Sequence, residues 1–192
     1  MPRVSTAGQL LAAGIASIHA HGFAATGVQE ITAAAGVPKG SFYNHFPSKA
    51  AFGLAVLDAY WDGAASTLDL LAEPGRPVPE RLTRHFRAVQ AWLGGSGQDC
   101  GCLLGNFAIE APSAGPEIRA RVDAIFARLT AALAECLREG AAEGTVRRDI
   151  APEDLAHLLL AAFQGCVQRG KVQADASGFD IFHRVMQRII AG

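Results

Sequence analysis

The chain has 192 residues, of which 50% are hydrophobic and 18% are charged. This composition is typical of a globular chain long enough to bury a sizeable core, and it excludes a largely disordered protein. The net charge of −1 would by itself argue against binding to nucleic acid, but residues 1–50 hold three basic residues against one acidic residue. The charge is therefore distributed in the direction that DNA binding by the N-terminal part would need.

Neither an export signal nor a membrane span is predicted. Residues 10–18 are apolar, but they follow no basic segment and are interrupted by polar residues. No run approaches the roughly 18 apolar residues that suggest a membrane span. We therefore expect a cytoplasmic protein whose four cysteines are thiols rather than disulfides.

The first predicted helix begins at Ser5 or Thr6 and ends at Gly22. Leu11, Ile15 and Ile18 recur in it at helical spacing, so we expect all three to face the core of a small N-terminal domain. This helix precedes the most informative stretch of the chain.

Residues 27–49 predict two short helices joined by a tight turn. The first covers residues 28–35, and Gly36 supplies a left-handed stop without Cβ strain. The second covers residues 39–45 and follows Pro38, whose missing N–H suits the first turn of a helix. Two helices with a short glycine-containing turn form a helix-turn-helix, whose second helix lies in the major groove of DNA.

The second of these helices carries more polar side chains than a core would use. Phe42 and Phe46 lie four residues apart, so they share one face and can anchor it to a core. The other faces carry potential donors to phosphates and base edges, namely Lys39, Ser41, Tyr43, Asn44 and His45. A capped surface helix with ordinary polar residues is the alternative interpretation.

Further helices are predicted at residues 48–71, 80–93, 102–110, 117–139, 152–171 and 179–190. The helix at 117–139 is expected to end at Gly140 and Gly144. We find no strand pattern and no repeat, so the predicted fold class is all-α with about nine helices.

The last two predicted helices are apolar over more than one stripe, so each needs partners on two sides. This favours a homodimer that forms through residues 152–190, in which a charge at Phe182 would disrupt assembly. The alternative is that both helices are buried within one monomer.

Cys100 and Cys102 form a C-x-C pair, but no second Cys or His pair lies at ligand spacing. We therefore expect neither a metal site nor a cofactor. Cys102 lies at a predicted helix start, where it either packs as a small apolar residue or is reactive because the helix dipole stabilises its thiolate. The sequence leaves both interpretations open.

Residues 36–49, G-V-P-K-G-S-F-Y-N-H-F-P-S-K, resemble the DNA-binding signature of the TetR family of bacterial transcriptional regulators, and the similarity covers roughly residues 6–60. It implies an all-α homodimer with a DNA-binding domain at residues 1–50 and a helical ligand-binding and dimerisation domain at residues 51–192. It also implies contacts with a palindromic double-stranded DNA operator from Gly27, Val28, Lys39, Gly40, Ser41, Tyr43, Asn44, His45 and Lys49. Asn44 departs from the family pattern, in which an aromatic residue or His is common, and this bears on the operator sequence.

The run G-C-L-L-G-N at residues 101–106, followed by Glu110, resembles one subgroup of that family, which includes regulators that respond to N-ethylmaleimide and to acrylate. In the electrophile sensor a cysteine at the position of Cys102 carries the response, and a lysine at the position of Lys171 also matches. We expect an effector pocket among the middle helices. Its candidate residues, any of which can equally be core, are Trp61, Phe86, Trp92, Asn106, Phe107, Arg121, Phe163 and Gln164.

These observations predict a dimeric transcriptional regulator, a repressor that a small-molecule or thiol-reactive effector releases from its operator, with no membrane partner and no enzyme activity. One alternative is an enzyme that uses Cys102 as nucleophile with His85 or His157 as base. The other is a dimeric ligand-binding protein that has lost DNA binding. The intact set of Lys39, Tyr43, His45 and Lys49 argues against that last alternative.

Overall fold

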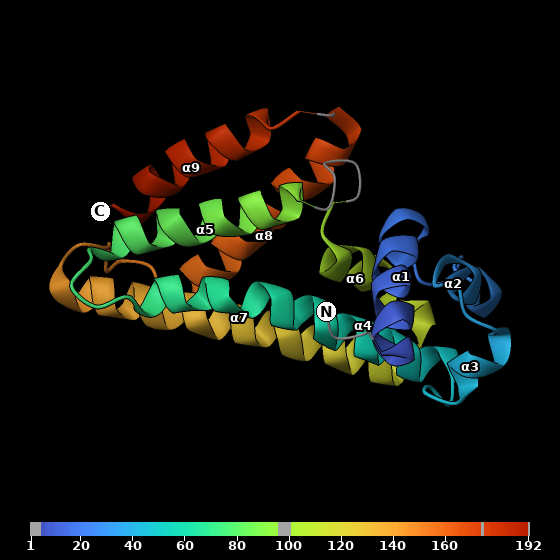
Figure 1. The fold of residues 1–192 in the computed structure, drawn as a ribbon. Coiled ribbons are helices and arrows are strands. Elements are labelled where there is room, and N and C mark those ends of the chain that lie inside the picture. The colour runs from blue at the N-terminus through green and yellow to red at the C-terminus, as the bar shows by residue number, and fades with distance from the viewer. Residues whose placement is uncertain (1–4, 96–100, 174, 192) are drawn as a thin grey trace. The chain divides into compact units, whose positions relative to one another are not determined.

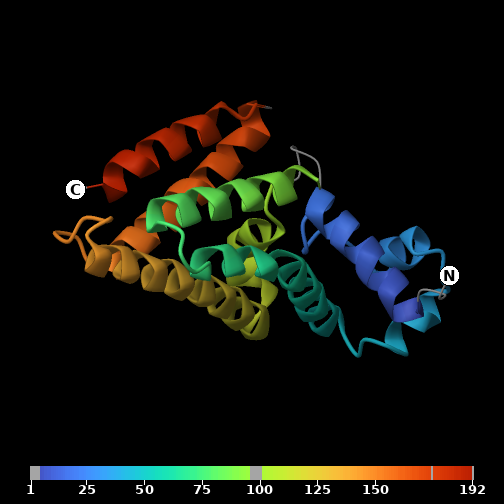
Figure 2. The same ribbon diagram turned by 60° about the vertical axis from the view of Figure 1, so that its left-hand side comes forward.

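The fold is shown in two views of a computed structural model, which describes residues 5–95, 101–173 and 175–191 (Figures 1 and 2). These residues form nine α-helices, a 3-10 helix and no strand, so the predicted all-α class is confirmed. In the described ranges no helix is both long and apolar enough to cross a lipid bilayer. The elements are α1 (Thr6–His21), α2 (Val28–Ala34), α3 (Lys39–Tyr43), α4 (Lys49–Ala65), η1 (Ser66–Ala72), α5 (Val78–Gly94), α6 (Leu103–Ala114), α7 (Pro116–Glu143), α8 (Pro152–Gln173) and α9 (Ser177–Ile190).

The first two N-terminal helices begin where the sequence predicts and end within one residue of the predicted ends, whereas α3 ends at Tyr43, two residues before the predicted end at His45. The Ser5 hydroxyl accepts a hydrogen bond from the Gly8 N–H at 3.1 Å and so caps α1, and Gly22 ends this helix at φ 89°. Gly36 takes φ 66° in the turn between α2 and α3, a left-handed conformation that glycine adopts without Cβ strain.

The helix predicted at residues 48–71 changes its winding near its end. It is α-helical as far as Ala65 and continues as the 3-10 helix η1 to Ala72. The Thr67 hydroxyl donates a hydrogen bond to the Ala64 carbonyl at 2.8 Å, across the spacing of three residues at which a 3-10 helix pairs its backbone. The tighter winding therefore begins where a side chain already bonds at that spacing.

Gly140 does not end α7, contrary to expectation. The helix continues to Glu143, and Gly144 at φ 77° ends it. A Cβ atom at Gly140 would lie 2.6 Å from Val146 and 2.8 Å from Val78, so the absence of a side chain serves close packing. Gly140 therefore allows Val78 and Val146 to pack closely on α7 and does not terminate the helix.

The described chain divides into two compact units. The first runs up to Gly63 and includes Leu103–Ala124, and the second comprises Ala64–Cys102 and Ile125 onward. The first unit therefore contains α6 and the start of α7 in addition to α1–α4. The expected boundary after residue 50 separates a DNA-binding domain from a ligand-binding domain by their functions, and it stays a prediction.

A cluster of aromatic rings anchors α3 to α4 in the first unit. The Phe42 ring, which is fully buried, lies 5.6 Å from the Phe46 ring and 5.1 Å from the Phe52 ring. The Phe46 and Phe52 rings are 4.8 Å apart in an edge-to-face arrangement. One face of α3 is thus fixed by aromatic packing, as its sequence predicts.

The buried face of α1 agrees with the expected one at Ile18 but differs from it in the first half of the helix. Leu10 and Gly14 are buried, whereas Leu11 and Ile15 are only half-buried. A Cβ atom at Gly14 would lie 2.2 Å from the Phe52 ring. The apolar pattern missed this register because the contact with α4 is made by a residue without a side chain.

The core of the second unit contains four phenylalanine rings. Phe86 lies 5.1 Å from Phe163 and 4.8 Å from Phe182, and Phe179 lies 5.3 Å from Phe163. These residues join α5, α8 and α9, and α9 packs against each of the other two helices (Figures 1 and 2). Phe182 is only 5% exposed, so a charge there would enter the core of one subunit before it reached any partner.

A buried arginine fastens the loop between η1 and α5. The Arg81 side chain donates to the Glu139 carboxylate of α7 at 2.7 and 2.9 Å and to the Arg76 carbonyl at 2.6 Å. The guanidinium holds the pKa of Glu139 below its usual value through this bidentate hydrogen bond and its charge. The pair ties three segments of the second unit together.

Candidate DNA-binding surface and effector site

The helix α3 presents most of its polar side chains to solvent. Phe42 faces inward, Tyr43 is 55% exposed, and Ser41 is half-buried. Lys39, Gly40, Asn44 and His45 are exposed. The structure therefore brings six of the nine predicted DNA-contacting residues onto α3 and the two residues that follow it, whereas Gly27, Val28 and Lys49 lie outside this segment.

The start of α2 lies next to a second open stretch of backbone. Gly27 is exposed, and no atom lies within 4 Å of the position that a Cβ atom would take there. Val28 is half-buried and begins the helix. These two residues leave room for a close approach to the backbone at this point.

Lys49 has an intramolecular role that the sequence did not indicate. Its Nζ donates a hydrogen bond to the Ala24 carbonyl at 3.0 Å and lies 4.8 Å from the centre of the Phe23 ring. The side chain thus connects the start of α4 to the loop between α1 and α2.

Cys102 is 6% exposed and directly precedes Leu103, the first residue of α6. The Gln164 side-chain Nε2 on α8 lies 3.9 Å from the Cys102 sulfur. The Gln164 Oε1 is buried and has no hydrogen-bond partner among the residues that the structure describes. The thiol therefore lies beside an amide group whose nitrogen faces the sulfur and whose oxygen is left without a described partner.

Lys171 approaches the same stretch through Gly101. Gly101 takes φ 72°, and a Cβ atom on it would lie 2.7 Å from Cδ of Lys171. The lysine stem therefore packs on the backbone next to Cys102. Cys100, the other member of the C-x-C pair, lies outside the described residues.

The other two described cysteines are poorly suited to react with electrophiles. Burial raises the pKa of the Cys136 thiol to about 11. Burial also raises the pKa of Cys166, whose sulfur lies 3.3 Å from the Gly178 carbonyl. Both side chains are therefore protonated at neutral pH, and the thiolate is the nucleophilic form.

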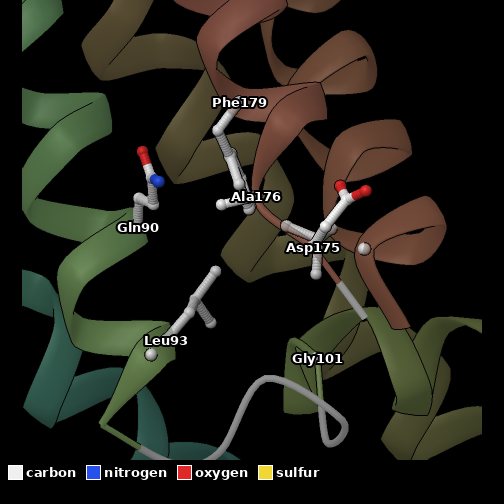
Figure 3. Close-up of a pocket in the computed structure, with 9 residues that line it drawn as sticks. Gln90, Leu93, Gly101, Asp175, Ala176 and Phe179 are labelled. Atoms are coloured by element: carbon white, nitrogen blue, oxygen red, sulfur yellow. The ribbon is translucent and has the colours of Figure 1, made fainter. Parts of the chain in front are cut away.

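Gly101 lines a cavity of about 90 Å³ in the second unit (Figure 3). Gln90 and Leu93 come from α5, and Phe179 comes from α9. The remaining lining residues are Gly94, Val167, Gly170, Asp175 and Ala176. A space of this size has room for only a few ligand atoms.

The predicted effector residues fall into three sets. Cys102, Gln164 and Lys171 come together in the second unit around Gly101. Phe86 and Phe163 also belong to this unit but pack in its aromatic core, and Trp92 is a half-buried residue of α5. The members that belong to the first unit are Trp61, Asn106, Phe107 and Arg121.

Three of the members in the first unit have partners there, namely Asn106, Phe107 and Arg121. Asn106 donates to the His19 carbonyl at 3.4 Å, and Arg121 pairs with Asp58 at 3.3 Å. Phe107 is fully buried, and its ring packs against another ring of the same unit. These residues therefore connect helices of the first unit, and the sequence pattern that suggested an effector pocket is equally typical of such packing residues.

An apolar groove of about 210 Å³ runs along α8 and α9. Leu158, Ile181 and Val185 line it and are 49%, 51% and 40% exposed. Such a row of large apolar side chains on neighbouring helices is typical of a protein interface. The groove lies within residues 152–190, and its use in dimerisation stays a prediction. Phe182, which the sequence singles out, also lines the groove but is only 5% exposed and packs in the core.

Two family models match the chain over most of its length. The model described as "Bacterial regulatory proteins, tetR family" matches residues 10–56. The model described as "Tetracyclin repressor-like, C-terminal domain" matches residues 78–186.

Individual proteins are similar over nearly the whole chain. The HTH-type transcriptional repressor DhaR of Mycobacterium sp. (strain GP1) is 39% identical over 86% of this chain and 82% of its own. The transcriptional regulator AcuR of Cereibacter sphaeroides is 33% identical over 97% of this chain and 86% of its own. The crystal structure of reduced NemR from Escherichia coli superposes with a TM-score of 0.87 at 26% identity and covers 97% of both chains.

Proposed function

Because the chain belongs to the TetR family of bacterial transcriptional regulators, we propose that it is a homodimeric repressor. In this proposal α2 and α3 bind a palindromic operator, and an effector that acts at Cys102 releases the protein from it. Membership confirms the family expected from residues 36–49. It makes the chain a DNA-binding regulator that acts as a dimer. The exposed polar face of α3 above its buried Phe42 anchor is the observation that carries the proposal.

The DNA contacts divide into two kinds. Lys39, Tyr43 and His45 carry donors suited to phosphates and groove edges, and Gly40 lets the backbone come close to the duplex. Ser41 and Asn44 are our candidates for reading bases, because hydroxyl and amide groups pair with base edges in the major groove. The chain carries a net charge of only −1, so its affinity must rest on a few such contacts, doubled by dimerisation.

Dimerisation is assigned to the groove along α8 and α9. Its exposed side chains, Leu158, Ile181 and Val185, are apolar, and two-fold pairing buries the same patch from both subunits. A helix-turn-helix protein reads the two halves of a palindrome with two such subunits, so assembly and operator affinity depend on each other.

Cys102 is the candidate point of effector action. Its thiol lies beside Gln164 and next to the stem of Lys171 on Gly101, and the cavity at Gly101 is small. The crystal structure of the relative NemR is described as a reduced form. At 6% exposure, the thiol admits only small reagents.

The mechanism is a shift between conformations. An effector weakens operator binding only if it prefers the conformer that binds DNA poorly. A coupling of about 1–3 kcal/mol, which is typical of allosteric proteins, would weaken binding roughly 5- to 150-fold.

The test uses the duplex that the wild-type chain selects from a randomised library. Fluorescence anisotropy measures its release by a quinone and by a short-chain carboxylate, in the wild type and in Cys102→Ser. A covalent sensor loses the quinone response in Cys102→Ser and keeps its DNA affinity, and mass spectrometry finds the label on Cys102 and not on Cys136. Release of both proteins by the carboxylate supports reversible binding instead. If neither compound changes binding, Cys102 is not the effector site.

An enzyme that uses Cys102 is the less supported alternative. His85, one candidate base, has its Nδ1 2.9 Å from the Thr67 carbonyl, and burial lowers its pKa. The homologues are transcriptional regulators. We therefore expect stoichiometric labelling without turnover, in a protein that works in the cytoplasm.

A further inference from the structure

Two polar side chains on α6 face the end of α1 within the first unit. Asn106 donates through Nδ2 to the carbonyl of His19, which lies in the last turn of α1. Glu110 accepts hydrogen bonds from the backbone N–H groups of Phe23 at 2.9 Å and Ala24 at 2.6 Å. Residues four apart share a face of a helix, so one face of α6 offers a donor to a helix-end carbonyl and an acceptor to the two amides that follow.

Gly22 makes room for the Glu110 carboxylate. A Cβ atom at Gly22 would lie 2.6 Å from Oε1 of Glu110, and the φ of 89° is itself one that side-chain-bearing residues rarely adopt. The Gly22 carbonyl accepts a hydrogen bond from the Thr26 hydroxyl at 2.7 Å. The loop is thus shaped to receive an acidic group.

The backbone of Ala24 is held through both of its polar groups, which belong to successive peptide groups. Glu110 binds its N–H, and the Nζ of Lys49 donates to its carbonyl at 3.0 Å. The neighbouring Phe23 ring lies 5.2 Å from the Phe107 ring of α6. The loop is therefore fixed to α6 and to the start of α4.

This loop leads directly to the start of α2. Only three residues separate Ala24 from Val28, so the position of the Ala24 backbone limits where α2 can begin. We propose that Glu110 is a positioning residue for operator binding, which holds the loop so that α2 and α3 are presented correctly to the duplex. The inference rests on the proposed function.

The hydrogen bonds between Glu110 and the loop also connect α6 to the start of α2, and so to the DNA-binding helices. Because α6 begins one residue after Cys102, a change at the thiol has a covalent path to the helix that bears Glu110. Glu110 of that helix accepts the hydrogen bonds from the loop before α2.

The sign of one substitution separates positioning from charge. Glu110→Gln removes a negative charge near the DNA-binding helices, and electrostatics alone would leave operator affinity unchanged or raise it. A positioning role predicts weaker operator binding instead. The Gln amide has only one acceptor oxygen, which is uncharged, so it cannot replace the two carboxylate oxygens that accept from Phe23 and Ala24. We expect roughly tenfold weaker binding, the factor that corresponds to one hydrogen bond to a charged group, with an unchanged salt slope.

The experiment measures anisotropy of the selected duplex with full-length wild type, Glu110→Gln, Glu110→Asp and the control Glu117→Gln. Glu117 is an exposed acid in the first turn of α7, also in the first unit. Glu110→Asp keeps the charge but loses reach, so it should bind less well than the wild type. Hydrogen exchange of residues 20–30 should rise in both Glu110 variants and not in the control.

Three results would overturn the inference. One is wild-type affinity in Glu110→Gln, as expected for the control. The second is a loss of affinity that matches the unfolded fraction, with exchange raised equally in all helices, because that is a purely structural role. The third is a wild-type chain that selects no duplex, which overturns the proposed function and this role with it.

Discussion

Replacing Ile181 by Asp should separate the dimer without unfolding the subunit. Ile181 lies in the groove along α8 and α9 and is half exposed, as are Leu158 and Val185. Full burial of such a side chain contributes about 1.5–3 kcal/mol, so covering the exposed half contributes about 1 kcal/mol. Three residues counted twice across a two-fold axis therefore contribute about 6 kcal/mol to assembly.

Ile181→Asp removes about 2 kcal/mol of this total, or roughly 30-fold in the dissociation constant of the dimer. It also places two carboxylates in an apolar contact, which adds a desolvation cost. We expect the dissociation constant to rise at least about 100-fold, and operator affinity to fall with it. Sedimentation velocity gives the oligomeric state, and anisotropy gives the affinity for the operator duplex.

Val172→Asp is the matched control, because Val172 is also on α8 and is 87% exposed but does not line the groove. Phe182→Asp is a poor test, because Phe182 packs on Phe86 and Phe163 and its charge would unfold the subunit. A variant at Ile181 that stayed dimeric would remove the groove from the interface. A monomer with full operator affinity would break the link between assembly and DNA reading.

Two further predictions concern single charged groups. Lys39→Met should weaken binding to all duplexes and lower the slope of log affinity against log salt by about one per contact. Lys49→Met should have the same effects and should in addition lower the unfolding temperature, because Lys49 donates a hydrogen bond to the Ala24 carbonyl. An unchanged salt slope in Lys39→Met would contradict the phosphate assignment. Arg81 lowers the pKa of Glu139, so the stability from this pair is complete above the unfolded-state pKa and is lost as pH falls through the lower folded-state value. Urea unfolding in this acidic range should show a steeper pH dependence for the wild type than for Glu139→Gln, and parallel curves would argue against the pair.

The elements could be predicted because their signals are local. Ser5, Gly22 and Gly36 act through their own backbone, so caps and turns were placed correctly from sequence. The register of α1 and the path of α7 could not be predicted, because Gly14 and Gly140 are chosen by residues far away in the chain. A glycine in a helix gives the same local signal whether it ends the helix or admits a neighbour.

The candidate site was predictable in part for the same reason. The polar face of α3 is visible from spacing alone, since Phe42 marks the opposite face. The partners of Asn106 and Lys49 lie 87 and 25 residues away along the chain, so their intramolecular bonds were not predictable from local pattern. Phe182 could not be told from an interface residue because core and interface share the same apolar spacing.

The aromatic anchoring of α3 has a consequence for how such a regulator can evolve. Phe42 alone is buried in this helix, so Tyr43, Asn44 and their exposed neighbours can be exchanged at little cost to folding. A duplicated copy of the gene could therefore acquire a new operator by a few substitutions on α3 while its interior stayed unchanged. The same separation gives protein engineers a short segment in which to retarget the repressor.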